Sequence, residues 1–199
     1  MIKHTVLAAL LTIGAVSVAS AAPITGSFSL ASFAGSYVGG TAATATGLDF
    51  GAAGGGVGNG YGTNGTAFVG NATGSFVGLT MASVSDISLG TTANPYVANP
   101  FLSFTGSNLV VNFSNAALTR SPLGTSITVT GSATFTDGIA ADATTGMFSL
   151  ATSSQNGMST DVNFTFTSNA STAVPEPVSM SLLGAGLIGM GALRLRRKA

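Results

Sequence analysis

The stretch 127-ITVTGSATFT-136 decides the fold class. Apolar side chains at Ile127, Val129, Ala133 and Phe135 alternate with threonine and serine, which is the period-two pattern of a strand with one buried and one exposed face. Asp137-Gly138 follows directly and is a typical turn between antiparallel strands. The stretch therefore predicts a β-strand that ends in a tight turn.

The same alternation continues on both sides of this stretch. Residues 147–151 predict the next strand, and after the turn residues Gln155-Asn156-Gly157 the positions Val162, Phe164 and Phe166 alternate with polar residues. No ten-residue window of the body has helical periodicity. The spacing of these short strands is like that of a sandwich or a barrel, and we expect an all-β fold, a single antiparallel β-sandwich or jelly-roll-like domain over residues 22–167. Further candidate strands lie at residues 24–38, 44–50, 66–69, 75–81, 84–89, 101–105 and 109–113.

The composition of the body removes most catalytic chemistry. Residues 22–174 contain no histidine, cysteine, lysine, glutamate or tryptophan. A Ser-His-Asp triad, a Cys-His dyad, a lysine Schiff base and a histidine-rich zinc site are therefore impossible there. Five aspartates and one arginine give the same region a formal charge of −4, which argues against nucleic-acid binding. We expect a protein that is not an enzyme and holds no cofactor.

Two weaker kinds of site remain open. Asp137 and Asp142 are the closest pair of carboxylates, and such a pair can serve a glycosidase or a weak calcium loop. Neither lies in a recognisable motif, so solvated turn charges are the favoured interpretation. The tyrosines Tyr37, Tyr61 and Tyr96 are the amphipathic rings available for stacking on sugars, which keeps a polysaccharide-binding module as the alternative function.

A glycine-rich stretch occupies residues 51–65. Gly60, Gly62 and Gly65 have the spacing of a dinucleotide-binding fingerprint, but that motif needs a helix after the glycines. Here a strand pattern follows. We therefore expect a mobile loop that ends in an Asn64-Gly65 hairpin turn rather than a phosphate site.

The N-terminus has the three parts of a secretory signal peptide at residues 1–21. Lys3 provides the positive charge, residues 6–18 are apolar, and Ala19-Ser20-Ala21 is a small-x-small cleavage site for signal peptidase. We expect cleavage after Ala21. An uncleaved N-terminal anchor is the alternative.

The C-terminus also has three parts. After a polar linker at residues 168–174 come Pro175-Glu176-Pro177, then an uncharged apolar run at residues 178–193. As a helix that run would span about 24 Å, somewhat less than a bilayer core of about 30 Å, so it predicts a short transmembrane helix. The basic end should act as a stop-transfer signal and stay in the cytoplasm. Its charges are Arg194, Arg196, Arg197 and Lys198.

This tail, residues 175–199, resembles the PEP-CTERM sorting signal of Gram-negative bacteria. The resemblance implies that a membrane-embedded exosortase recognises the tail and cuts near Pro175-Glu176-Pro177. It also implies an exported protein that passes through an inner-membrane intermediate to the cell surface or the exterior. A structural or adhesive role in the extracellular matrix, in biofilm or floc, would follow, with extracellular polysaccharide as a partner. A plain single-span anchor is the alternative reading of the tail.

Overall fold

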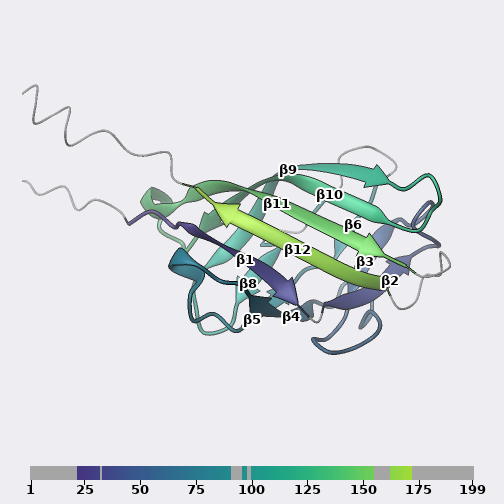
Figure 1. The fold of residues 1–199 in the computed structure, drawn as a ribbon, viewed down its shortest axis with the longest axis horizontal. Coiled ribbons are helices and arrows are strands. Elements are labelled where there is room, and N and C mark those ends of the chain that lie inside the picture. Colours follow the sequence, from purple (N-terminus) through teal and green to yellow (C-terminus); the bar gives the residue numbers. More distant parts are fainter. Residues whose placement is uncertain (1–21, 32, 91–95, 98–99, 155–161, 172–199) are drawn as a thin grey trace, which may run out of the picture.

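The computed structural model of the chain describes residues 22–31, 33–90, 96–97, 100–154 and 162–171, and these confirm the all-β prediction (Figure 1). Helix within these residues is limited to two single 3-10 turns. The strands are β1 (Gly26–Ala31), β2 (Ala34–Val38), β3 (Gly47–Phe50), β4 (Gly65–Gly70), β5 (Met81–Val84), β6 (Ile87–Ser88), β7 (Tyr96–Val97), β8 (Leu102–Phe104), β9 (Val110–Arg120), β10 (Ile127–Thr136), β11 (Thr144–Ser153) and β12 (Val162–Ala170), and the turns are η1 (Gly74–Phe76) and η2 (Ala140–Asp142).

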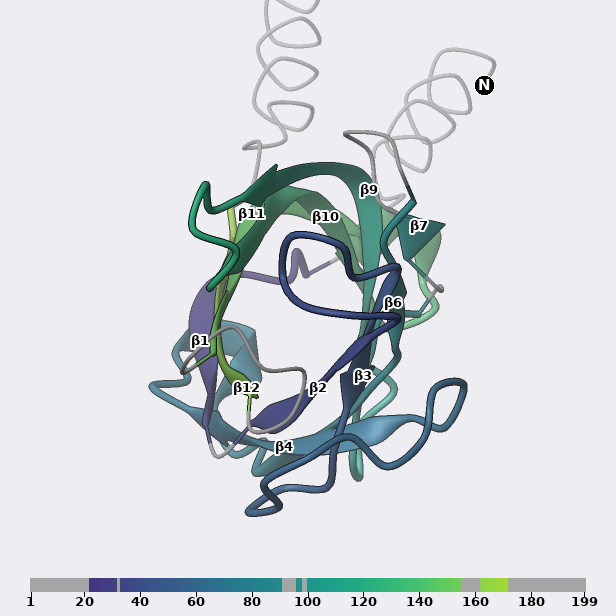
Figure 2. The same ribbon diagram turned by 90° about the vertical axis from the view of Figure 1, so that its right-hand side faces the viewer.

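Eight of the strands in the described part of the chain form a closed antiparallel barrel (Figure 2). Their order is β1-β4-β5-β8-β9-β10-β11-β12, and β12 pairs with β1 to complete the ring. The predicted sandwich or jelly roll is therefore wrong. Alternating residues show that one face of each strand is buried, but both a sandwich and a barrel satisfy that pattern. The pairing of the first strand with the last one distinguishes them.

The remaining strands extend from one edge of β12. The beginning of β12 pairs with β2 at Val162 and Asn163, and β2, β3, β6 and β7 then follow side by side. The segment between β2 and β3 crosses the end of the barrel that faces the viewer in Figure 2. Ala42 and Ala45 in this segment are buried, and the Arg120 guanidinium donates hydrogen bonds to both of their carbonyls. The arginine of β9 thus fixes the cover over this end of the barrel.

The stretch at residues 127–136 forms β10, as predicted. It pairs with β9 on one side and β11 on the other, and Val129 lies opposite both Leu118 and Leu150. The β9–β10 register shifts between Ser132, which pairs with Asn115, and Ala133, which pairs with Phe113, so β9 contains one extra residue at this bulge while the alternation of β10 continues. Gly138 has φ +97°, a conformation that glycine adopts readily, so the predicted turn chemistry also holds.

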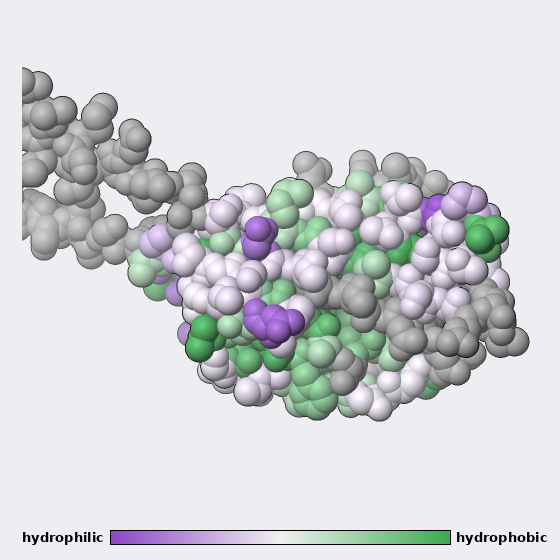
Figure 3. Space-filling model, viewed as in Figure 1, coloured by the Kyte–Doolittle hydropathy of each residue, from purple (hydrophilic) through white to green (hydrophobic). Residues whose placement is uncertain are grey.

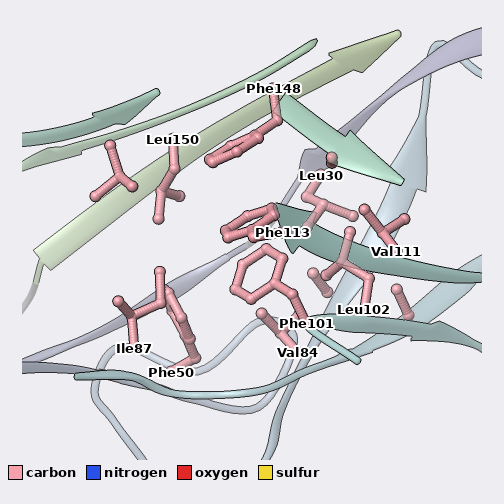
Figure 4. Packing of buried hydrophobic residues seen from close by; sticks show 14 of the residues in the cluster. Leu30, Phe50, Val84, Ile87, Phe101, Leu102, Val111, Phe113, Phe148 and Leu150 are labelled. Carbon is pink, nitrogen blue, oxygen red and sulfur yellow. The ribbon is translucent and has the colours of Figure 1, made fainter. Parts of the chain in front are cut away.

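Aromatic rings fill the barrel. The Phe113 ring stacks on the Phe148 ring with centroids 3.6 Å apart, and its centroid lies 4.2 Å from that of Phe101, so β9, β11 and the residue just before β8 contribute to one column of rings (Figure 4). Such pairs stabilise a fold beyond the area they bury. The side chains with no exposed surface include Phe50, Phe76, Phe101, Phe135, Leu48, Leu102, Ile127 and Leu150.

The two ends of the body lie side by side, because Gly26 of β1 pairs with Ala170 of β12 (Figure 1). Strand β12 continues through residues 168–170, which were expected to be linker, and Ser168 is buried. Within the described residues no helix is long and apolar enough to span a membrane. The predicted signal peptide at residues 1–21 and transmembrane helix at residues 178–193 lie outside them.

The contacts among the buried phenylalanine rings lead to a prediction about stability. Phe101→Ala should lower the free energy of unfolding by about 3–5 kcal/mol, because it removes a fully buried ring and leaves a cavity. Phe68→Ala is the matched control, since the Phe68 side chain is 43% exposed on the outer face of β4, and its loss should be much smaller. Chemical denaturation of the purified chain measures both. Equal losses would mean that the Phe101 ring is not part of the stabilising core.

Candidate functional site

Three polar side chains lie in a row across neighbouring strands. The β2–β3 register places Ser36 opposite Asp49. The β3–β6 register pairs Leu48 with Ile87, and Asp86, which directly precedes β6, lies close enough to Asp49 for the two charges to interact. Cross-strand neighbours of this kind project from the same face of a sheet. The row therefore brings together residues from three separate parts of the sequence.

The glycine-rich loop, residues 51–64, covers this row. The Gly58 N–H donates to Ser36 Oγ at 3.1 Å, the Gly60 N–H to Asp49 Oδ2 at 3.1 Å, and the Gly62 N–H to Asp86 Oδ2 at 2.7 Å. All four residues of β3 are buried, because the core packs on one side of the strand and the loop on the other. The loop is thus anchored, and this differs from the mobile loop that was expected.

The glycine spacing has its explanation in this contact. A Cβ at Gly58 would lie 2.3 Å from the Asp49 carboxyl carbon, so no larger residue fits there. Gly60 and Gly62 have φ of +108° and +96°, which other residues rarely adopt. Their N–H groups already bind carboxylates, which makes a phosphate site at these glycines unsuitable. Gly65 does not close a hairpin onto β3; it begins β4, which pairs with β5.

The two carboxylates of the row carry a poorly compensated charge. Burial is the main reason that the pKa of Asp86 is raised, and the nearby Asp49 charge raises it further. Hydrogen bonds from the Phe50 and Gly62 N–H groups oppose this shift. Asp49 is 8% exposed, and its Oδ1 is buried without a hydrogen-bond partner among the described residues.

The tyrosines differ in what they offer to a ligand. Tyr61 is 49% exposed and its ring lies against Gly47, where a Cβ would come within 2.7 Å of the ring. Tyr37 is buried, and its hydroxyl is hydrogen-bonded to Thr152 at 2.7 Å. Burial raises the pKa of Tyr37, although the Thr152 hydrogen bond and the Arg120 charge lower it. The side chain of Tyr96 lies outside the described residues, so Tyr61 is the ring for which a sugar-facing role can be argued.

The predicted carboxylate pair lies elsewhere, in the hairpin between β10 and β11. Asp137 Oδ1 accepts the N–H of Ile139 at 2.9 Å within its own turn. Asp142 ends η2, and its Oδ1 is buried without a hydrogen-bond partner among the described residues. No hydrogen bond joins the two aspartates in the described part of the chain. The Asp137 carboxylate thus has a local structural role in the turn.

Sequence reasoning did not single out Asp49, Asp86 or Ser36. A signal was present at Asp49, because the glycine-rich loop begins two residues after it. Asp86 and Ser36 are brought to it only by strand register. The predicted sorting and cleavage residues lie outside the described residues: Ala19, Ala21, Pro175, Glu176, Pro177, Arg194, Arg196, Arg197 and Lys198.

Comparison with known protein families identifies the tail. The family model described as the PEP-CTERM protein-sorting motif matches residues 173–198. The chain carries a PEP-CTERM sorting motif. This motif supports an exported protein that is processed by an exosortase and sorted to the cell envelope or exterior. No curated protein and no solved structure matches the chain.

The raised pKa of Asp86 predicts an unusual pH dependence. Because its folded-state pKa lies above the unfolded value, the folded chain binds this proton more tightly, and the associated stability is lost as the pH rises through the folded pKa. The free energy of unfolding of the native chain minus that of Asp86→Asn should therefore decrease from pH 4 towards neutral pH, because only the native chain carries this ionisable group. Denaturation curves over this range measure it. A difference that grows with pH would show that the hydrogen bonds outweigh burial.

Proposed function

We propose that this chain is a non-catalytic exported protein that an exosortase sorts, and that its barrel has a structural or adhesive role in the extracellular matrix. The observation that carries the proposal is the PEP-CTERM sorting motif at residues 173–198. The motif supports the route of export, and the composition and surface of the barrel support its structural or adhesive role.

The body is suited to passive association rather than to catalysis. Aromatic and aliphatic side chains occupy the barrel interior, and residues 22–174 lack histidine, cysteine, lysine and glutamate. The face in Figure 3 is largely pale, with green hydrophobic areas over its lower part and only small strongly hydrophilic areas. Exposed serine, threonine and asparagine groups can hydrogen-bond to neutral polysaccharide, and such contacts depend little on salt because few charges take part.

Processing would also change the charge of the protein. Four of its six basic residues lie in the last six positions. A cut near Pro175-Glu176-Pro177 removes them and leaves a body with a formal charge of −4 after signal-peptide cleavage. The processed barrel would then have no basic tail to hold it on an anionic membrane surface.

A deletion strain tests the proposed role. Loss of the gene should reduce cell aggregation and alter matrix composition, and the native chain should restore both. A chain with Glu176→Gln should accumulate at full length in the membrane fraction and fail to restore them, because the sorting motif is damaged. Immunoblots of cell fractions, together with aggregation and matrix assays, provide the measurements. Normal aggregation and matrix in the deletion strain would overturn the structural role.

Polysaccharide binding is the second candidate function, and the exposed ring of Tyr61 favours it. The ring is supported from behind by the Gly47 backbone. On both sides of it in sequence, the N–H groups of Gly60 and Gly62 are hydrogen-bonded to carboxylates. A ring fixed in this way can stack on a sugar with little loss of conformational entropy.

The Tyr61 ring gives this candidate a sharp test. If the ring stacks on a sugar, Tyr61→Ala should weaken binding to the recognised polysaccharide, whereas Tyr61→Phe should retain most of the affinity. Glycan-array binding followed by calorimetry measures both variants. If the native protein bound no glycan on the array, this candidate function would be excluded. Equal affinity of the native and Tyr61→Ala chains would place any binding elsewhere.

A further inference from the structure

One oxygen atom beneath the glycine-rich loop accepts no hydrogen bond from the residues that the structure describes. Asp49 Oδ2 accepts the Gly60 N–H, but Asp49 Oδ1 is buried and accepts no hydrogen bond among the described residues. The residue is more than nine-tenths buried. A buried carboxylate oxygen without a partner is costly, and in native proteins such an atom often has a bound ion or water as its partner.

A second carboxylate worsens the electrostatics of this position. Asp86 directly precedes β6, which pairs with β3, and the Asp49 charge acts on the Asp86 carboxyl; two like charges so close disfavour each other's ionised form. Arg120, the basic residue of the described body, is occupied by the carbonyls of Ala42 and Ala45. Its charge acts on Tyr37. The row thus holds two negative charges and no cation from the described chain.

We propose that Ser36, Asp49 and Asp86 form a binding site for a divalent cation of the calcium type beneath the glycine-rich loop. Two carboxylates and a hydroxyl are hard oxygen donors, which suit Ca²⁺ and do not suit zinc or copper. No group of three or more His, Cys, Asp or Glu side chains gathers in the described residues. Backbone carbonyls and water would therefore supply the remaining ligands, as they do in many calcium sites.

The small number of carboxylates indicates weak binding. Sites with few charged ligands in extracellular modules bind Ca²⁺ with Kd of about 10⁻⁴–10⁻³ M, which suits a protein that is exported. The same carboxylates hold the N–H groups of Gly60 and Gly62. A cation on them would therefore also brace the loop segment that presents Tyr61.

A single proton shared by the two carboxyls is the competing way to relieve the same repulsion. The two outcomes differ in what stabilises the fold. A proton stabilises it on acidification whether or not calcium is present, whereas a cation stabilises it at neutral pH in proportion to RT ln(1 + [Ca²⁺]/Kd). This difference makes the proposal testable without knowledge of the protein's biological role.

The experiment is thermal unfolding of the full chain at neutral pH over a range of calcium concentrations. The native chain should show a saturable rise in unfolding midpoint at millimolar Ca²⁺. Asp49→Asn and Asp86→Asn should abolish that rise. Asp137→Asn is the matched control, because its carboxylate accepts a turn N–H in a different hairpin, and it should keep the rise in full.

A second measurement covers the case in which an aspartate variant does not fold. Tb³⁺ replaces Ca²⁺ in oxygen sites, and the chain has tyrosines but no tryptophan to excite it. Tyrosine-sensitised Tb³⁺ luminescence of the native chain should appear and should fall when Ca²⁺ displaces the Tb³⁺. Ser36→Ala should weaken the Ca²⁺ affinity several-fold.

Three results would overturn the proposal: no calcium effect at neutral pH, stabilisation by acid alone, or a calcium effect that Asp137→Asn removes while Asp49→Asn keeps it.

Discussion

The pairing of β1 with β12 is the interaction on which the rest of the structure depends. Residues 26–30 at the start of the body pair with residues 166–170 at its end, and β1 uses its other edge to pair with β4. Without this pairing the sheet would be open and expose two unpaired strand edges, which promote aggregation. With it the interior is enclosed, and Phe28 and Leu30 of β1 join the common core. The cost is the entropy of bringing together the most distant parts of the body.

The local elements of this fold could be predicted from the sequence, but the closure of the ring could not. The strand at residues 127–136 and the turn at Asp137-Gly138 follow from side-chain alternation and turn chemistry, which act between near neighbours. Ser168 shows the limit of such reasoning. Its polar surroundings in sequence predicted a linker, yet it lies in a strand with β1 on one side and β11 on the other and is buried. Pairing between distant strands decided its position.

The same limit applies to the candidate site. A glycine-rich loop was evident, and its fingerprint-like spacing was correctly judged to lack the helix that a dinucleotide site needs. Its real contacts, however, are with Asp49 and Asp86, and only the register of β3 with β6 brings these together. Asp137 and Asp142 were close in sequence and were therefore the natural pair to consider. These two residues share one hairpin, whereas Asp49 lies in β3 and Asp86 directly precedes β6, 37 positions later in the sequence.

The closure of the barrel and the sorting signal are connected because the closing strand β12 lies just before the signal in the chain. The barrel cannot close until β12 is present, and β12 is the last strand before the sorting motif. Pro175 lies five positions after Ala170, so covalent geometry limits the distance between them to about 17 Å. Any protease that binds Pro175-Glu176-Pro177 must therefore work close to the end of the barrel where Gly26 and Ala170 pair. The short connection that leads to the motif follows β12, the strand that closes the barrel. Folding of the body therefore brings the barrel close to the motif and limits the space in which a protease can approach it.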